Sequence, residues 1–317
     1  MAMQTVLNRK LLVITGKGGV GKTTIAAAVG MAAAATGRRT IVVEVGQESR
    51  LPSLFGVTAP QQGVETRLQE GLSSISIDPD RALLEWLQAL GGRVSGRVLA
   101  SSGTIQYIAA AAPGAKELIA MVKIWQLTRG GGRGTRSGGY ELVVLDAPAT
   151  GHALGMLNSP QTFGAIARVG PIAGYTRQIQ QLLETPSHTA YVAVALATEM
   201  AVTEVLELQA GLQRQLGRDL EAVVVNALLP RRFTARELAR IESLGDVPSA
   251  PQTAQQAAIR SAIQAARAVH DRARFQHNQL ARLRRRSFDV VPVPFLWGEE
   301  LGLAAVAGIA KRLEQRL

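Results

Sequence analysis

The sequence contains no cysteine and few aromatic residues. Among its 317 residues are three Trp, four Tyr and six Phe, or 4% of the chain, against 47% hydrophobic residues in total. The lack of cysteine excludes a thiolate metal site and a cysteine nucleophile. It also fits a reducing compartment, so we expect a cytoplasmic protein. The few aromatic residues predict a core built mainly from aliphatic side chains.

Long hydrophobic runs are also missing. No run reaches the roughly 20 apolar residues that span a bilayer. The Ala-rich run Ile25–Ala35 is shorter and is interrupted by Gly30, so it predicts a buried helix. The first ten residues show no apolar segment before a small-residue cleavage site, so we expect no secretory signal. We therefore expect no transmembrane segment.

Positive charge is in excess and is unevenly spread. The formal net charge is +11, and the segment Arg260–Arg286 holds eight arginines against the single acid Asp271. Such a segment could face nucleic acid, an anionic membrane surface or a negatively charged partner. Because a run of like charge is usually a solvated helix face, we do not expect a nucleic-acid partner. Peripheral membrane contact stays open.

Short apolar runs alternate with helical patterns along the chain. Runs without polar alternation are typical of strands buried on both faces of a parallel sheet. We expect such strands at residues 10–14, 40–45, 141–146, 191–196, 222–226 and 289–293. Strands alternating with helices predict an α/β fold, with a mostly parallel sheet and helices on both faces.

Two stretches between the strands are too long for simple connections. About 95 residues separate the second expected strand from the third, far beyond an ordinary loop. Apolar residues at helical spacing occur at 81–90 and 116–127, and again at about 160–183. We expect one domain over residues 1–317, with a helical insertion subdomain formed by insertions at about 78–130 and 155–187.

A phosphate-binding motif follows the first expected strand. Residues Gly16–Thr23 match G-x-x-x-x-G-K-[ST] between a strand and a helix, which is the context that this motif requires. Backbone N–H groups of such a loop cradle phosphate oxygens. The expected nucleotide-binding residues of this loop are Gly16, Lys17, Gly18, Gly19, Val20, Gly21, Lys22, Thr23 and Thr24.

Three side chains in and beside this loop have expected roles in holding ATP and Mg²⁺. Lys22 should reach the β- and γ-phosphates, and the Thr23 hydroxyl should ligate Mg²⁺. Asp146 ends the third expected strand, where a second carboxylate usually holds the ion through water. ATP and Mg²⁺ are therefore the expected cofactors.

The motifs resemble those of a known family. The loop GKGGVGKTT resembles the deviant phosphate loop of the MinD/ParA/arsenite-pump ATPase class. DAPATGHALGML resembles the switch II of the branch with the arsenite-pump ATPase and the tail-anchored-protein targeting ATPase of the GET pathway. PGAKEL, EMAVTE, VVVNALLP and PVPFLWGEELG resemble further motifs of that branch. The resemblance covers nearly the whole chain and is strongest to single-domain actinobacterial ArsA-like ATPases.

This resemblance implies roles for several residues. The extra lysine of the loop, here Lys17, would cross a dimer interface to the phosphates of the partner. Asn226 would meet adenine, and Pro292 and Pro294 would lie in the adenine-side loop. The protein would be an ATP-hydrolysing P-loop NTPase that works as a homodimer, or as a heterodimer with a paralogue.

One position departs from the pattern of the branch. The branch carries D-P-A-H after the second strand, and the Asp of that motif, which orients the attacking water, falls on Gly46 here. A glycine cannot act as a general base. Glu44 and Glu48 are the remaining candidates, although either could be a solvated loop acid. With Lys17 and Lys22 they complete the catalytic candidates, and we expect slow hydrolysis.

Three functions fit these motifs. The first is ATP-driven closure of a dimer that binds or targets hydrophobic segments of tail-anchored or membrane proteins. The second is a MinD/ParA-like positioning ATPase on a membrane or DNA surface, and the third a weakly hydrolysing regulatory subunit. Without cysteine, thiolate binding of arsenite and a zinc clasp are excluded. The apolar residues of the insertion helices could form either a client groove or core.

Overall fold

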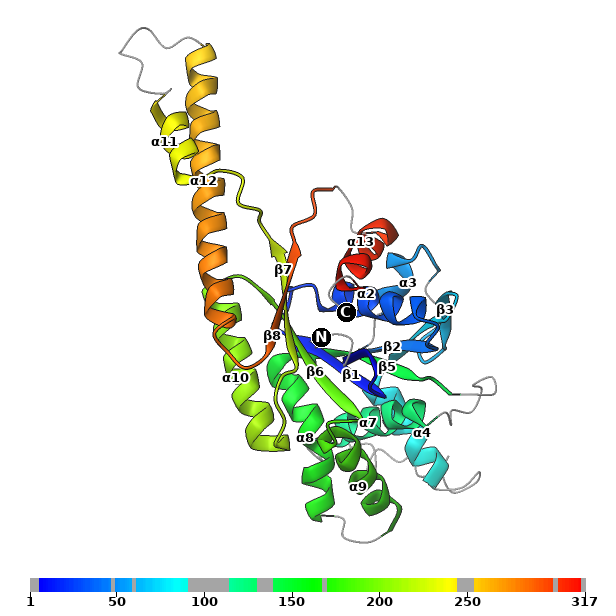
Figure 1. The fold of residues 1–317 in the computed structure, drawn as a ribbon. Helices are drawn as coiled ribbons and strands as arrows, with labels where there is room; N and C mark the ends of the chain where they lie inside the picture. Colours follow the sequence, from blue (N-terminus) through cyan, green and yellow to red (C-terminus); the bar gives the residue numbers. More distant parts are fainter. Residues whose placement is uncertain are drawn as a thin grey trace.

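The fold is built around one eight-stranded sheet (Figure 1). The computed structural model describes residues 6–46, 49–58, 61–90, 114–129, 139–166, 170–243, 254–298 and 302–314. The strands are β1 (Leu11–Gly16), β2 (Thr40–Val45), β3 (Thr66–Gln69), β4 (Leu72–Ile77), β5 (Leu142–Ala149), β6 (Thr189–Leu196), β7 (Ala222–Leu228) and β8 (Asp289–Pro294).

The strand order is β3-β4-β2-β5-β1-β6-β7-β8, and every pairing is parallel except that of β3 with β4. The first strand therefore lies between β5 and β6, and the chain winds outward from it in both directions. In such sheets ligands bind beyond the carboxyl ends of the strands at this switch point. The order thus places the loop after β1 where a ligand is expected.

The sheet confirms the mostly parallel α/β prediction but has two more strands than the sequence analysis expected. Both β3 and β4 lie between the second and third expected strands, just before the helical insertion expected at about 78–130. The sequence of β4, LSSISI, mixes apolar residues with serines, and two of the serines, Ser74 and Ser76, are buried. These serines interrupt the continuous apolar run that marks the central strands, so β4 lacks that signal.

Alternate residues of the central strands enter two separate hydrophobic cores. On β1, Leu11 and Val13 belong to one core, whereas Leu12 and Ile14 belong to the other. All four side chains are fully buried. This period of two, with both faces covered, explains why these strands read as uninterrupted apolar runs.

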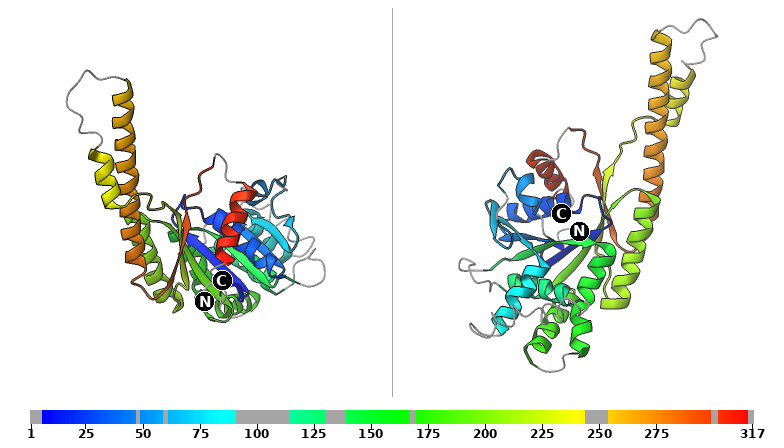
Figure 2. Two further views of the ribbon diagram at one scale, coloured as in Figure 1. Left: turned by 45° about the horizontal axis from the view of Figure 1, so that its top comes forward. Right: turned by 180° about the vertical axis from the view of Figure 1, so that it is seen from behind.

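Helices cover both faces of the sheet (Figure 2). On one face α2 (Lys22–Ala35) packs against the sheet and against α13 (Leu303–Glu314). On the other face lie α7 (Ala115–Thr128), α8 (Thr150–Ile166), α9 (Gly170–Glu184) and α10 (Glu199–Leu216), with α4 (Pro79–Leu90) packed on α7. A short α3 (Leu51–Leu54) follows β2.

The insertion helices differ in detail from the sequence prediction. The expected helical stretch at 160–183 is two helices, and the first of them, α8, already begins at Thr150. Helix α10 begins at Glu199, because the Thr198 hydroxyl accepts a hydrogen bond from the N–H of Ala201. Side-chain capping of this kind sets helix starts independently of the apolar pattern.

Two helices form an arm that projects from the body (Figures 1 and 2). It consists of α11 (Ala235–Ser243) and the 30-residue α12 (Ala254–Leu283). The lower part of α12 packs on β7 and α10, and its upper part lies beside α11. No helix among the described residues is both long and apolar enough to cross a membrane.

Candidate nucleotide site

The loop between β1 and α2 requires glycine at two positions. A Cβ on Gly16, whose φ is +148°, would collide with the carbonyl oxygen of Val194 on β6. Gly21 caps α2 in the left-handed region with a φ of 91°, and a Cβ there would collide with the Asn226 side chain. The loop therefore lies tightly against the neighbouring strands at the amino end of α2, where anions bind well.

The two residues that begin α2 face the end of β5. Thr23 Oγ1 donates a hydrogen bond of 2.6 Å to Oδ2 of Asp146. Lys22 Nζ donates to the carbonyl oxygen of Lys17 at 3.0 Å, so its ammonium group lies over the loop. Partial burial lowers the pKa of Lys22, and the nearby Asp146 carboxylate opposes this shift. The structure thus brings Lys22, Thr23 and Asp146 together, as the motif predicts.

Asp146 is a buried carboxylate, and one of its two oxygens has no hydrogen-bond partner among the described residues. Burial raises its pKa to about 6, the hydrogen bond from Thr23 opposes the shift, and the neighbouring Glu44 adds to it. Its Oδ1 atom is buried and has no hydrogen-bond partner in the described part of the chain. Buried polar atoms are almost always partnered, so an orphan here points to a ligand. Carboxylate and hydroxyl oxygens are the donors that Mg²⁺ prefers.

A cavity of about 470 Å³ opens beside these groups. Its walls include Lys22, Thr23 and Asp146 together with Glu44 and Arg50. The positive charge of Arg50 tends to lower the pKa of Asp146. No motif in the sequence pointed to Arg50. Its only sequence signal is that it follows the candidate acids of the same loop.

Glu44 is committed to shaping the loop after β2. It is 6% exposed, and its two oxygens accept hydrogen bonds from Ser49 Oγ at 2.7 Å and from the N–H groups of Arg50 and Leu51 at 2.9 and 3.3 Å. It is therefore not a solvated acid, and a role as base stays a prediction. Glu48 lies outside the described residues. Gly46 lies at the end of β2 and also lines the cavity.

Lys17 makes a contact that the sequence analysis did not predict. Its Nζ lies 2.8 Å from Oε1 of Glu204 on α10, and the two side chains are 37% and 31% exposed. Exposed pairs of this kind contribute about 0–1 kcal/mol, so the pair can exchange for another partner. Glu204 belongs to the quoted motif EMAVTE, which was its only sequence signal.

The residues expected near adenine lie on the two strands beyond β6, namely β7 and β8. Asn226 Nδ2 donates to the carbonyl oxygen of Val20 at 2.9 Å, and Asn226 Oδ1 accepts from the N–H of Ala227. Pro292 and Pro294 lie on β8, and Pro294 pairs in register with Leu228. Asn226 thus joins β7 to the phosphate loop, and contact with adenine stays a prediction. Gly18 and Gly19 are exposed loop residues, whereas Val20 is buried.

A phosphate loop at the switch point of a parallel α/β sheet defines a P-loop nucleotide-binding fold. Residues 9–182 match the model of the ArsA family, described as anion-transporting ATPases. This match covers more than half of the chain, and the protein belongs to the ArsA ATPase family.

Curated relatives carry ATPase names. ATPase BagA of Mycobacterium tuberculosis is 30% identical over 238 residues, which cover 73% of this chain and 68% of that protein. An arsenical pump-driving ATPase of Escherichia coli is 26% identical over 71% of this chain and 40% of its own length. ATPase GET3 of Paracoccidioides lutzii is 29% identical over 50% of this chain and 46% of its own. The protein is therefore a member of a family of ATPases.

Proposed function

We propose that this protein hydrolyses Mg²⁺-bound ATP at the β1–α2 loop. The observation that carries this proposal is the buried, unpartnered Oδ1 of Asp146 beside the Thr23 hydroxyl. Thr23 and Asp146 would hold Mg²⁺, with Asp146 acting directly or through water. The bound ion would neutralise charge on the phosphate oxygens. Lys22 would exchange its bond to the Lys17 carbonyl for the β- and γ-phosphates.

The proposal extends to a dimer closed by ATP. Lys17 is paired with Glu204 of its own chain through a half-exposed contact. We infer that Lys17 exchanges this carboxylate for the phosphates bound to a second copy or a paralogue. Because a phosphate group carries more negative charge than Glu204, closure is favoured when ATP is present. Residues 1–317 would act as one ATPase domain. The two helical insertions would move together with the segment DAPATGHALGML, which resembles switch II.

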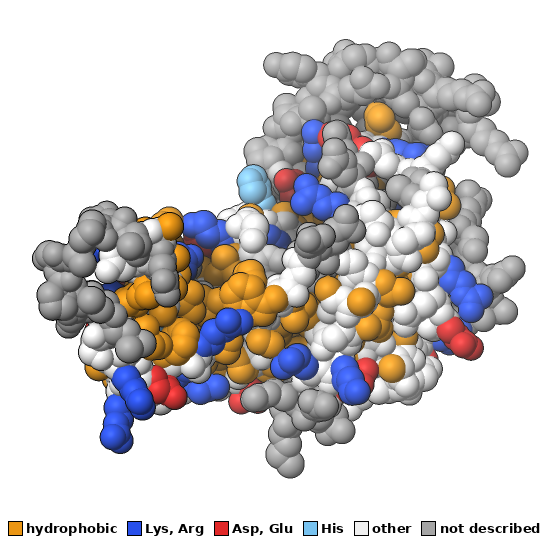
Figure 3. All heavy atoms as spheres, turned by 90° about the horizontal axis from the view of Figure 1, so that it is seen from above, with side chains coloured by type: hydrophobic (Ala, Val, Ile, Leu, Met, Phe, Trp, Pro, Cys, Tyr) orange, Lys and Arg blue, Asp and Glu red, His pale blue; other side chains and the backbone are white. Residues whose placement is uncertain are grey.

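The proposed cargo is a hydrophobic protein segment. Met121 and Met156 are buried, as is most of α7, so these side chains form core and not a groove. Exposed apolar side chains occur elsewhere, at Met200, Phe275 and Trp297. Figure 3 looks down on the carboxyl ends of β7 and β8, where hydrophobic side chains gather in a patch bordered by Lys and Arg. Contiguous apolar surface supports client binding.

The experiment that tests the core proposal is a comparison of Asp146→Asn with the wild type. ATP turnover and the stimulation by Mg²⁺ are measured at saturating nucleotide. We expect the variant to fold and to lose Mg²⁺-dependent turnover by 100-fold or more, of the order of about 3 kcal/mol of barrier. Turnover at the wild-type level would show that the site lies elsewhere.

Two observations favour the alternative functions. The basic arm favours a positioning ATPase on an anionic surface. Gly46 at the position of the water-orienting Asp favours a weakly hydrolysing regulatory subunit. Turnover far below that of a dimeric relative under identical conditions, with ATP-dependent dimerisation intact, would support the regulatory role.

A further inference from the structure

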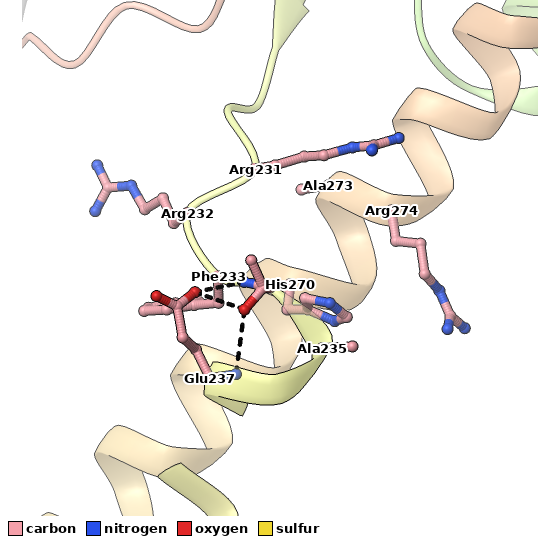
Figure 4. Close-up of a pocket in the computed structure, with 9 residues that line it drawn as sticks. Arg231, Arg232, Phe233, Ala235, Glu237, His270, Ala273 and Arg274 are labelled. Carbon is pink, nitrogen blue, oxygen red and sulfur yellow. Dashed lines mark hydrogen bonds between the residues drawn. The ribbon is translucent and has the colours of Figure 1, made fainter. Parts of the chain in front are cut away.

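A second cavity lies at the root of the α11–α12 arm (Figure 4). Its volume is about 450 Å³, and it opens where the segment before α11 runs alongside α12. Three arginines line it, Arg231, Arg232 and Arg274, together with His270 and Phe233. None of its lining residues borders the nucleotide cavity. The two cavities are therefore separate sites.

Two of the three arginines have no partner within the described residues. The guanidinium carbon of Arg232 lies 4.8 Å from the centroid of the Trp297 ring, and in Figure 4 this side chain points away from the other two arginines. Arg231 and Arg274 are exposed and make no ion pair or side-chain hydrogen bond in the part of the chain that the structure describes. Both are free to bind a ligand.

The acidic groups nearby are already occupied. Glu237 also lines the cavity, but its carboxylate accepts bonds of 2.8 Å from both the N–H and the hydroxyl of Thr234, which caps α11. Asp271 on α12 is paired with its neighbours His270 and Arg267. No carboxylate among the described residues therefore neutralises Arg231 or Arg274.

The wider arm reinforces this excess of positive charge. Residues 230–243 and 254–286 contain twelve arginines, no lysine and three acids, a net +9 out of +11 for the whole chain. Clustered like charges repel one another, and an anion bound among them relieves that repulsion. Arginine in place of lysine favours ligands with several oxygens, since its planar group binds phosphate through two hydrogen bonds.

We propose that this cavity binds a phosphate group, either of a free phosphate-bearing molecule or of a lipid headgroup. Arg231 and Arg274 supply the charge, and the His270 and Phe233 rings form a wall. The methyl side chains of Ala235 and Ala273 leave the cavity open. In Figure 4 the guanidinium groups of Arg231 and Arg274 point in different directions, so both exposed side chains must turn toward the cavity to hold one phosphate. A phosphate can then offer separate oxygens to the two guanidinium groups. The site is independent of the proposed ATPase function.

The test uses the full chain with its nucleotide site filled by Mg²⁺ and a non-hydrolysable ATP analogue. Inorganic pyrophosphate is titrated by calorimetry, and vesicles of phosphatidylcholine with or without phosphatidic acid are tested by co-sedimentation. The double variant Arg231→Gln/Arg274→Gln is compared with Arg284→Gln/Arg285→Gln. The control pair is also exposed and directly follows the carboxyl end of α12, but it does not line the cavity.

We expect the cavity variant to bind at least about tenfold more weakly, since it loses both charged hydrogen-bond donors. The control should change less than about twofold. Loss of pyrophosphate binding identifies a free phosphate ligand, and loss of phosphatidic-acid binding alone identifies a headgroup. Equal losses in both variants, or none, overturn the proposal. Binding of a hexaglutamate peptide as tight as that of pyrophosphate also overturns the proposal. So does binding of duplex DNA that is weakened equally in both variants.

Discussion

At the scale of single residues, the nucleotide site depends on partners that only the fold supplies. Asp146 carries a raised pKa because burial disfavours its charged form, although the Thr23 hydroxyl donates to it. Lys17 is held by Glu204 from a helix 187 positions further along the chain. Each of these contacts gives a measurable consequence.

The first consequence is a pH dependence of stability. The pKa of Asp146 in the folded chain is about 6, above the ordinary aspartate value of 3.8. Between these two pH values the folded state therefore holds a proton that the unfolded state has lost. The contribution of Asp146 to the free energy of unfolding is therefore fully present below about pH 4 and is lost as the pH rises through about 6. Denaturant unfolding without Mg²⁺ or nucleotide should show a loss of about 3 kcal/mol. Asp146→Asn should remove it, whereas the exposed Asp271→Asn should not.

The second consequence concerns the Lys17–Glu204 pair. Lys17→Ala should leave the monomer folded but abolish ATP-dependent dimerisation and turnover. Glu204→Gln should release Lys17 and allow dimerisation at lower protein concentration, as measured by analytical ultracentrifugation with an ATP analogue. Glu207→Gln is the matched control, because Glu207 is an exposed acid on the same helix. If Lys17→Ala hydrolyses ATP like the wild type, the crossing role is wrong.

At the scale of elements, the β1–α2 loop is held in place by the strands on either side of β1. Gly16 passes the Val194 carbonyl on β6, and Thr15 Oγ1 donates to the carbonyl oxygen of Pro148 on β5 at 3.2 Å. The loop conformation is thus determined by close contacts with neighbouring strands as well as by its own sequence.

Substitution of two glycines in the same loop should separate these effects. Gly16→Ala should lower the free energy of unfolding by about 2–4 kcal/mol, because its methyl group meets a buried carbonyl and its φ is positive. Gly18→Ala should leave it within about 0.5 kcal/mol, since nothing lies within 4 Å of the added carbon. Thermal unfolding measures both. Equal stability of the two variants would contradict the packing described here.

At the scale of the whole molecule, one buried arginine joins elements far apart in the sequence. Arg218 is 5% exposed and donates to the carbonyl oxygens of Leu183 and Thr189 at 3.1 and 2.9 Å. It also pairs with Glu221 at 2.7 Å, and its guanidinium group lies over the Tyr191 ring. The end of α9 and the start of β6 are thereby fixed next to β7.

Arg218→Met should destabilise the protein by about 3–5 kcal/mol, because Glu221 loses its charge partner and two buried carbonyls lose their donors. Nucleotide affinity per folded molecule should stay unchanged, since Arg218 does not line the nucleotide cavity. Arg267→Met, on the exposed face of the arm, is the control and should cost under about 1 kcal/mol. Equal destabilisation by both would show that burial of Arg218 is not decisive.

The sequence by itself determined the central sheet, the phosphate loop and the family. Continuous apolar runs and a glycine-rich motif are local signals, so they need no knowledge of distant contacts. Strands β3 and β4 were not predicted, because their sequences at this edge of the sheet contain no continuous apolar run. Only the tertiary structure decided that Glu44 shapes a loop, that Lys17 pairs with Glu204 and that Arg231 and Arg274 share a cavity. Such pairings depend on the arrangement of distant segments, which no local pattern encodes.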